Sequence, residues 1–187
     1  MTRLPRSLTL GFTLALLFSG VMVTSGCGKK TETSGTTDVP GTPKSVSKSV
    51  AAEADGYAGE AAFALQLRDY PRAAEALSKA LKLRDDIPDW WMDYGVVQKL
   101  AGNLSEAKKG YQKALALHEK RYALTKEPMQ LMPQIHMLLL LSREKDARAV
   151  LEKALKAHPS DRHLKEFSDH KEIDRLLQDP YIREHKL

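Results

Sequence analysis

Cysteine is nearly absent from this sequence. The 187 residues include a single one, Cys27, so the chain has no means of forming an internal disulfide framework. Aromatic residues are also few, at 6%, yet hydrophobic residues of all kinds reach 42%. A chain of this length and composition is expected to form one ordinary domain with a mainly aliphatic core.

A strong excess of one charge is also missing. The chain has 29 basic and 24 acidic residues, a net charge of +5. Two of the basic residues, Arg3 and Arg6, lie in a segment that we expect to be removed, which leaves 27 against 24, or about +3. Elsewhere acids and bases alternate, as in DRHLKEFSDHKEIDR at 161–175, a pattern typical of solvated helix faces. We therefore expect no nucleic-acid partner.

Motifs that carry catalysis or bind cofactors are absent too. The sequence contains no G-x-S-x-G, no phosphate-binding loop and no G-x-G-x-x-G. No two histidines have the i, i+4 spacing of a metal-binding helix, and no cysteine or paired carboxylate completes a site with His158, His163 and His170. We expect no catalytic residue, no cofactor and no metal, and hence no enzyme.

The most apolar stretch of the chain lies at its N-terminus. Residues 8–23 form an uncharged, mainly apolar run of 16, preceded by Arg3 and Arg6. A transmembrane helix needs about 20 apolar residues. The run is shorter than that, and with its basic start it fits the hydrophobic region of a secretory signal.

The end of this segment resembles a bacterial lipobox. Two small residues precede Cys27, and Thr24 stands where an aliphatic residue is usual. The resemblance implies a lipoprotein signal peptide at 1–26, a lipid on Cys27 and anchoring in the bacterial cell envelope. Gly28 in place of aspartate favours the outer membrane, with the protein facing the periplasm. A plain cleaved signal with a free cysteine and an uncleaved anchor remain as alternatives.

The next segment, 27–44, is polar and rich in Ser, Thr, Gly and Pro. It has no apolar periodicity and therefore no surface to bury that would offset the entropy of ordering. We expect the lipidated Cys27 to be followed by a disordered linker.

A repeat of 34 residues dominates the remainder. The matched pairs are Tyr70 and Leu104, Ala73 and Ala107, Leu77 and Tyr111, Ala80 and Ala114, and Leu81 and Leu115. A fixed period of this size indicates stacked helical hairpins. A third copy ends at Pro159, and its Ala147 follows Ala107 by 40 residues, so six residues are inserted. The prediction is an all-α solenoid of about three hairpins over 45–159.

Local signals predict where these helices begin and end. The first helix should start at Ser45 or Ser47 and reach about Arg68, unless Gly56 and Gly59 kink it or move its start to about Ala54. The second helix should be capped by Asp69, and the third should start at Pro88 or Asp89. The fourth should begin with a capping box of Asn103 and Glu106 and extend to about Leu124. The fifth should start at Pro133, or near Pro128 with a kink, and the sixth should be capped by Ser142.

The last segment, 160–187, carries an apolar stripe between charges. A solenoid exposes an apolar flank on its final hairpin, and an atypical amphipathic segment has to cover it. We expect capping helices here. Of the adjacent tryptophans, Trp91 is expected in the core, whereas Trp90 could sit at a rim or touch a partner.

These residues resemble the tetratricopeptide repeat (TPR) family. The second repeat carries most of the likeness, through Trp91, Gly95, Gly102, Ala107, Tyr111 and Ala114. The resemblance implies a groove lined by the first helix of each hairpin and bound by a protein or peptide. Its inward positions would be Ala58, Ala62, Leu65, Met92, Asp93, Val96, Lys99, Leu100, Met132, His136, Leu139 and Leu140.

Within that groove, we predict partner binding at Met92, Val96, Lys99, Leu100, Met132, His136 and Leu139. Lys99 is the only basic residue among them, which disfavours the family's mode of gripping acidic peptide ends. Met, Val and Leu suit an apolar or amphipathic peptide. The function implied is a lipid-anchored periplasmic adaptor. Two alternatives stay open: these side chains pack between repeats, or the protein is a structural lipoprotein that self-associates.

Overall fold

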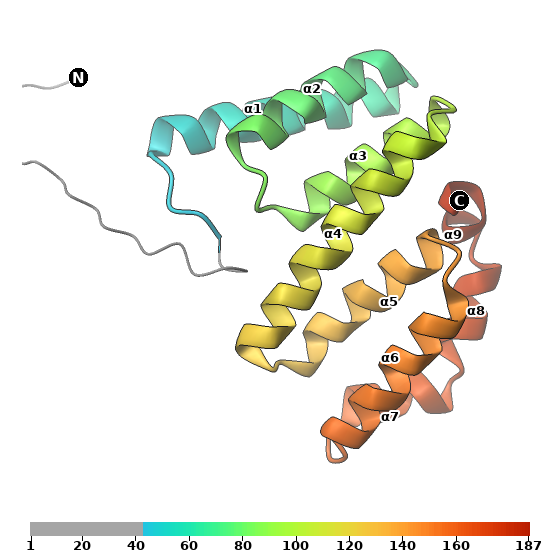
Figure 1. Ribbon diagram of the computed structural model, residues 1–187. Helices are drawn as coiled ribbons and strands as arrows, with labels where there is room; N and C mark the ends of the chain where they lie inside the picture. The colour runs from blue at the N-terminus through green and yellow to red at the C-terminus, as the bar shows by residue number, and fades with distance from the viewer. Residues whose placement is uncertain (1–42) are drawn as a thin grey trace, which may run out of the picture. The chain divides into compact units, whose positions relative to one another are not determined.

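The computed structural model describes residues 43–187, and every regular element within this range is helical (Figure 1). The expected all-α class is therefore confirmed for this part of the chain. The predicted signal peptide at 1–26, the lipidation site Cys27 and the linker as far as residue 42 lie outside the described residues. Within residues 43–187, no helix combines the length and apolar character needed to span a membrane.

Three helical hairpins follow one another. Their helices are α1 Lys48–Gln66 with α2 Tyr70–Leu83, α3 Pro88–Leu100 with α4 Leu104–Thr125, and α5 Leu131–Leu140 with α6 Glu144–Ala157. Between hairpins, α2 packs on α3 and α4 packs on α5. The inserted residues are taken up by the long α4 and by a short 3₁₀ turn, η1 Pro128–Gln130, that leads into α5. Three shorter helices complete the fold, namely α7 Arg162–Asp169, α8 Glu172–Gln178 and α9 Pro180–His185.

The turns inside the three hairpins share one geometry. Arg68, Gly102 and Ser142 all have positive φ, of 57°, 82° and 58°. At each turn, the amide of the next residue donates to a carbonyl five residues back, as Asn103 N does to Gln98 O at 2.8 Å. This is the hydrogen-bond pattern that ends a helix with a left-handed residue. The spacings of 34 and 40 in sequence thus correspond to one repeated backbone structure.

Buried residues repeat with the same spacing. Ala73 and Ala107 are each 0% exposed, as are Ala80 and Ala114. Small side chains at these points let the two helices of a hairpin approach closely. The alanines identified from the repeat are therefore the contacts that hold each hairpin together.

Several predicted boundaries are confirmed. Ser47 caps α1 by accepting from the amide of Val50, and Asp69 caps α2 by accepting from Arg72. Helix α1 runs through Gly56 and Gly59, so the later start was wrong. The long α4 ends one residue past the predicted Leu124.

Two predicted caps are wrong. Asn103 does precede α4, but its side chain donates to Gln98 Oε1 at 2.8 Å, and Glu106 accepts from Tyr94 Oη at 2.9 Å. Their side chains therefore form no capping box. Ser142 is the left-handed residue of its turn, and α6 begins at Glu144, after Arg143. In both cases the shared turn geometry, rather than side-chain capping, ends one helix and starts the next.

The second hairpin has the closest helix crossing. A Cβ added at Gly110 would lie 2.7 Å from the backbone of Gly95 and of Trp91. One added at Gly95 would lie 2.5 Å from the ring of Tyr111, which is itself fully buried. Glycine at both positions is required because backbone and aromatic ring occupy the space of a side chain.

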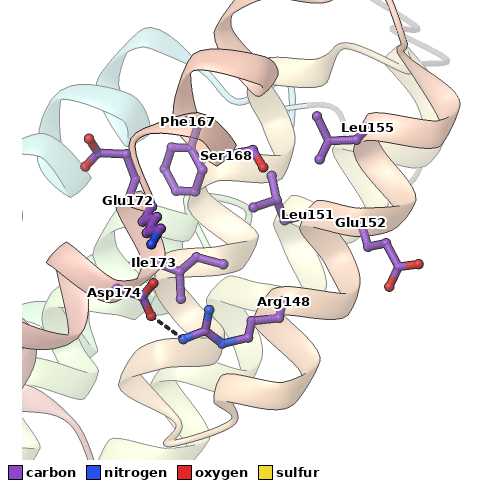
Figure 2. A pocket seen from close by; sticks show the side chains of 10 residues that line it. Arg148, Leu151, Glu152, Leu155, Phe167, Ser168, Glu172, Ile173 and Asp174 are labelled. Atoms are coloured by element: carbon purple, nitrogen blue, oxygen red, sulfur yellow. Dashed lines mark hydrogen bonds and ion pairs between the residues drawn. The ribbon is translucent and has the colours of Figure 1, made fainter.

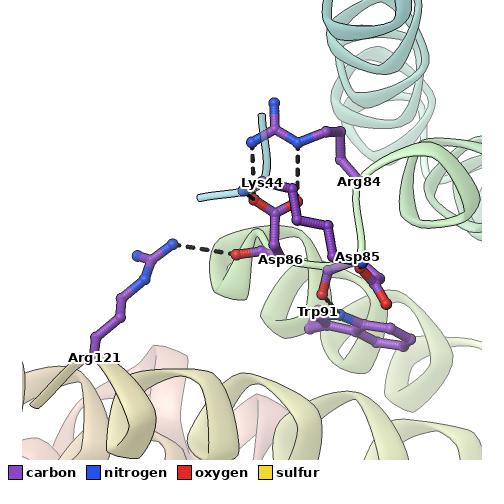
Figure 3. Close-up of polar contacts among 6 residues, drawn as sticks. All are labelled: Lys44, Arg84, Asp85, Asp86, Trp91 and Arg121. Atoms are coloured by element: carbon purple, nitrogen blue, oxygen red, sulfur yellow. Dashed lines mark hydrogen bonds and ion pairs between the residues drawn. The ribbon is translucent and has the colours of Figure 1, made fainter. Parts of the chain in front are cut away.

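The start of the fold is fastened to the turn between α2 and α3 (Figure 3). The buried Asp86 carboxylate accepts two hydrogen bonds from Arg84, at 2.9 and 3.0 Å, and one from the backbone amide of Lys44 at 2.7 Å. Lys44 Nζ also pairs with Asp85 at 2.6 Å, and Arg121 of α4 donates to Asp86 O at 3.2 Å. Burial alone would raise the pKa of Asp86, but these donors outweigh it and the pKa is lowered.

Candidate protein-binding site

The first helices of the three hairpins, α1, α3 and α5, form a surface that we call the A-helix face. It has two halves that differ in accessibility. Between α3 and α5, the C-terminal helices lie on the face, and α9 contacts both helices. Between α1 and α3 the face is open and forms a groove.

The covered half is closed by three long-range hydrogen bonds. Tyr111 Oη, from α4, donates to His185 O at 2.8 Å, and Leu187 N donates to Leu140 O at 2.8 Å. Ser142 Oγ donates to the carbonyl oxygen of Leu187. The end of the chain is thereby joined to two hairpins at once.

Apolar packing accompanies these hydrogen bonds. Ile173 of α8 and Ile182 of α9 are each 3% exposed and belong to the same buried cluster as Val96 and Leu140. The segment 160–187 was expected to cover the flank of the last hairpin. It does more than that, since α7 contacts α6 whereas α9 lies on the A-helix face.

Because the C-terminal helices cover this half, some of the predicted partner-binding residues are buried. Val96 and Leu139 are 4% and 1% exposed and lie in the core, so the expectation that they line an open groove is corrected. Leu139 is buried because α5 is apolar on nearly all sides and such a helix must be covered, and Val96 of α3 packs into the same cluster with Ile173 and Ile182.

Other members of that set are more accessible. Met92, Leu100 and Met132 are partly buried against the same cluster, Lys99 is half-buried, and His136 is exposed. Met92 and His136 line a small cavity of about 270 Å³ together with Tyr181 and Ile182 of α9. The desolvation of its ring lowers the pKa of His136, opposed in part by the charge of Asp179. This cavity is what remains of the groove once α9 is in place.

The tryptophans are both structural. Trp91 packs against the cluster of the second and third hairpins, and its Nε1 donates to Asp85 O at 2.9 Å. Trp90 packs against the cluster of the first hairpin, so it joins two repeats.

The open half is a groove of about 380 Å³ between α1 and α3. Helix α1 contributes Ala58, Ala61, Ala62, Leu65 and Gln66, α2 contributes Leu77 at the floor, and α3 contributes Asp93 and Val97. Its size falls in the range of ligand-binding pockets, roughly 300 to 1,000 Å³. Four residues assigned inward from the TPR resemblance, Ala58, Ala62, Leu65 and Asp93, do meet in this groove.

Asp93 is the one ionisable residue that lines this groove among the described residues. Burial and the nearby charge of Asp89 raise the pKa of its carboxyl to about 6. The predicted set of partner contacts omitted Asp93, although the TPR resemblance had placed it at an inward position.

A second pocket lies on the other side of the third hairpin, between α6, α7 and α8 (Figure 2). It mixes apolar residues such as Leu151 and Phe167 with charged ones. Arg148 at its edge already pairs with Asp174 at 2.5 Å and with Glu144 at 2.8 Å. Glu152 and Glu172 are also paired, with Lys156 and Arg175, so most charges of this pocket are satisfied within the protein and it offers a poorer site than the groove.

Two histidines, His118 in α4 and His158 directly after α6, pack within the fold. His158 follows α6, and its Nε2 lies 3.0 Å from Tyr122 Oη of α4. His118 is buried in α4, and the desolvation of its ring lowers its pKa. Among residues 43–187, no group of three His, Cys, Asp or Glu is placed to hold a metal ion.

Comparison with known proteins adds no assignment. No protein-family model and no curated protein matches the chain.

Proposed function

We propose that this chain is a TPR-like adaptor that binds a protein or peptide through the groove between α1 and α3 and catalyses no reaction. The observation that carries the proposal is this groove, which is apolar, accessible and built from the first helices of two successive hairpins. A peptide laid along it would bury its apolar side chains against Leu65, Leu77 and Val97.

The repeated hairpin supports the TPR-like assignment. Three left-handed turns with one hydrogen-bond pattern, and alanines buried at matching positions, are what stacked copies of one unit require. The six-residue insertion and the 3₁₀ turn before α5 set the third hairpin apart.

The proposal includes an address in the bacterial cell envelope. The sequence of residues 1–27 supports it, with two arginines, an apolar run and a single cysteine. A lipid on Cys27 would hold the adaptor at the outer membrane, facing the periplasm. Replacing Cys27 by serine should release the protein from the membrane fraction, and unchanged membrane association would contradict this part.

Site-specific photo-crosslinking in living cells tests the groove. A crosslinking amino acid at position 62, on the groove, should capture a protein that the same amino acid at position 153 does not. Both positions are exposed, and Lys153 lies on α6, away from the groove. Equal capture at both positions would overturn the binding site. A product of twice the chain's own mass would instead support self-association.

A further inference from the structure

The groove between α1 and α3 holds one charge that nothing balances. Among the described residues, no hydrogen bond or ion pair reaches the Asp93 carboxylate, although the side chain is half-buried. Carboxylates removed from water are normally paired because an isolated charge in an apolar setting is costly. The Asp93 carboxylate is therefore available to pair with a group from another molecule.

The charge of a neighbouring residue increases the free-energy cost of an unpaired Asp93 carboxylate. Asp89 lies one turn earlier on α3, and its charge adds to the cost of ionising Asp93. The charge of Asp93 also acts on Tyr181 of α9, whose pKa is raised by burial and by that charge. The residues that α1 and α2 contribute to the groove carry no charge. Among the described residues that line the groove, none is positively charged.

We propose that the groove binds an amphipathic segment of a partner protein that places a lysine or arginine against Asp93 and apolar side chains on the floor of the groove. This specifies the partner class for the adaptor function proposed above and rests on it. The small side chains of Ala58, Ala61 and Ala62 would let the partner's backbone come close.

Charge complementarity excludes the other kinds of segment. An acidic segment would be repelled by Asp93, which lines the groove, and by the nearby charge of Asp89. A wholly apolar segment would bury the carboxylate without a partner, which costs more than the same contact costs at an uncharged groove. A basic residue among apolar ones is the occupant that satisfies both the charge and the apolar wall.

A display library of twelve-residue segments tests this with the full chain as bait. The pool selected by the wild type should be enriched in Lys or Arg at one position between apolar residues. Asp93→Asn should lose that enrichment, and Asp93→Lys should replace it with Asp or Glu. The Kd of a labelled winning peptide, read by fluorescence anisotropy, should rise about tenfold or more on Asp93→Asn. Asp146→Asn, an exposed site on α6, should leave the Kd unchanged.

A groove-filling variant separates the two levels of the proposal. Ala62→Trp places a large ring over the groove. If it leaves selection unchanged, or if the wild type selects nothing, both the groove and the basic partner are wrong. If Ala62→Trp abolishes selection but the wild type and the variants at position 93 select the same peptides, the groove does bind a partner and the proposal of a basic partner is wrong. Circular dichroism melts of each variant show whether a loss of binding comes from unfolding.

Discussion

The first two hairpins have the same frame and different inner faces. Their turns and their buried alanines correspond position by position, 34 residues apart. At the helix crossing they diverge, because Ala61 and Ala76 of the first hairpin are replaced by Gly95 and Gly110 in the second. The neighbouring Leu77 is replaced by Tyr111.

These three differences act together. Gly95 leaves room for the Tyr111 ring, which a Cβ there would overlap, and Gly110 lets the backbone of α4 approach that of α3. The ring in turn carries its hydroxyl to His185 O, so the second hairpin holds the C-terminal helix. Leu77 has no hydroxyl to do the same, and the first hairpin keeps an open groove. One repeat anchors the C-terminal helix, and the other keeps an open groove.

The largest expected effect is a difference in unfolding free energy between an asparagine placed in the covered half and one placed in the open half of the A-helix face. Ile182→Asn puts an amide into the core at a residue that is 3% exposed, and should cost about 3 kcal/mol of unfolding free energy. Ala62→Asn, on the open groove, should change it by less than about 0.5 kcal/mol. Urea denaturation measures both. Similar losses for the two variants would mean that the halves do not differ as described.

The helix crossing of the second hairpin gives the next largest effect. Gly110→Ala forces a Cβ against backbone atoms 2.7 Å away and should cost about 2 kcal/mol. Gly59→Ala, where a Cβ meets nothing within 4 Å, should stabilise α1 by about 0.5 to 1 kcal/mol. Thermal melts compare them, and a stabilising Gly110→Ala would show that the crossing is looser than this.

Asp93→Asn should stabilise the free protein, by up to about 2 kcal/mol at pH 7.5. The folded pKa, about 6, lies above that of an unfolded aspartate, so the folded state resists ionisation and this cost is present above pH 6. As the pH falls from 6 to 4, the folded carboxyl becomes neutral and the unfolded one begins to be protonated, so most of the advantage of the variant should disappear. Urea midpoints at pH 7.5 and pH 4 measure it. A gain that does not depend on pH would contradict the burial of the charge.

The anchor itself gives the smallest effect. Tyr111→Phe keeps the ring and removes the 2.8 Å hydrogen bond to His185 O, which should cost about 1 kcal/mol. It should also speed hydrogen exchange at the amide of Leu187, which donates to Leu140 O. Tyr57→Phe, whose hydroxyl makes only a long, exposed contact of 3.5 Å with Glu53, should change neither. If both variants behave alike, Tyr111 does not anchor α9.

The repeat itself could be predicted because packing imposes it. Alanines that must be small at each crossing, and a left-handed residue at each turn, leave a period in the sequence. Helix starts were predicted correctly where a side chain does the capping, as at Ser47 and Asp69. At Asn103 the start was also correct, but the predicted capping box was wrong because the turn's own hydrogen bonds take over.

The covering of the A-helix face could not be predicted from the repeat. It depends on contacts such as Tyr111 with His185, which are 74 residues apart and leave no local pattern. One sign was available. The run LMPQIHMLLL in α5 is apolar on nearly every side, and a helix of that kind needs neighbours on both faces.

The buried Asp86 also decides where a pull on the N-terminal side of the chain is felt. Lys44 binds Asp86 and Asp85, and Arg84 and Arg121 tie the same turn to α2 and α4. Tension arriving through the preceding residues therefore loads the junction between the first two hairpins before it can unwind α1. The groove walls, α1 and α3, lie on either side of that junction, so such a pull is resisted before it separates the two helices that form the groove.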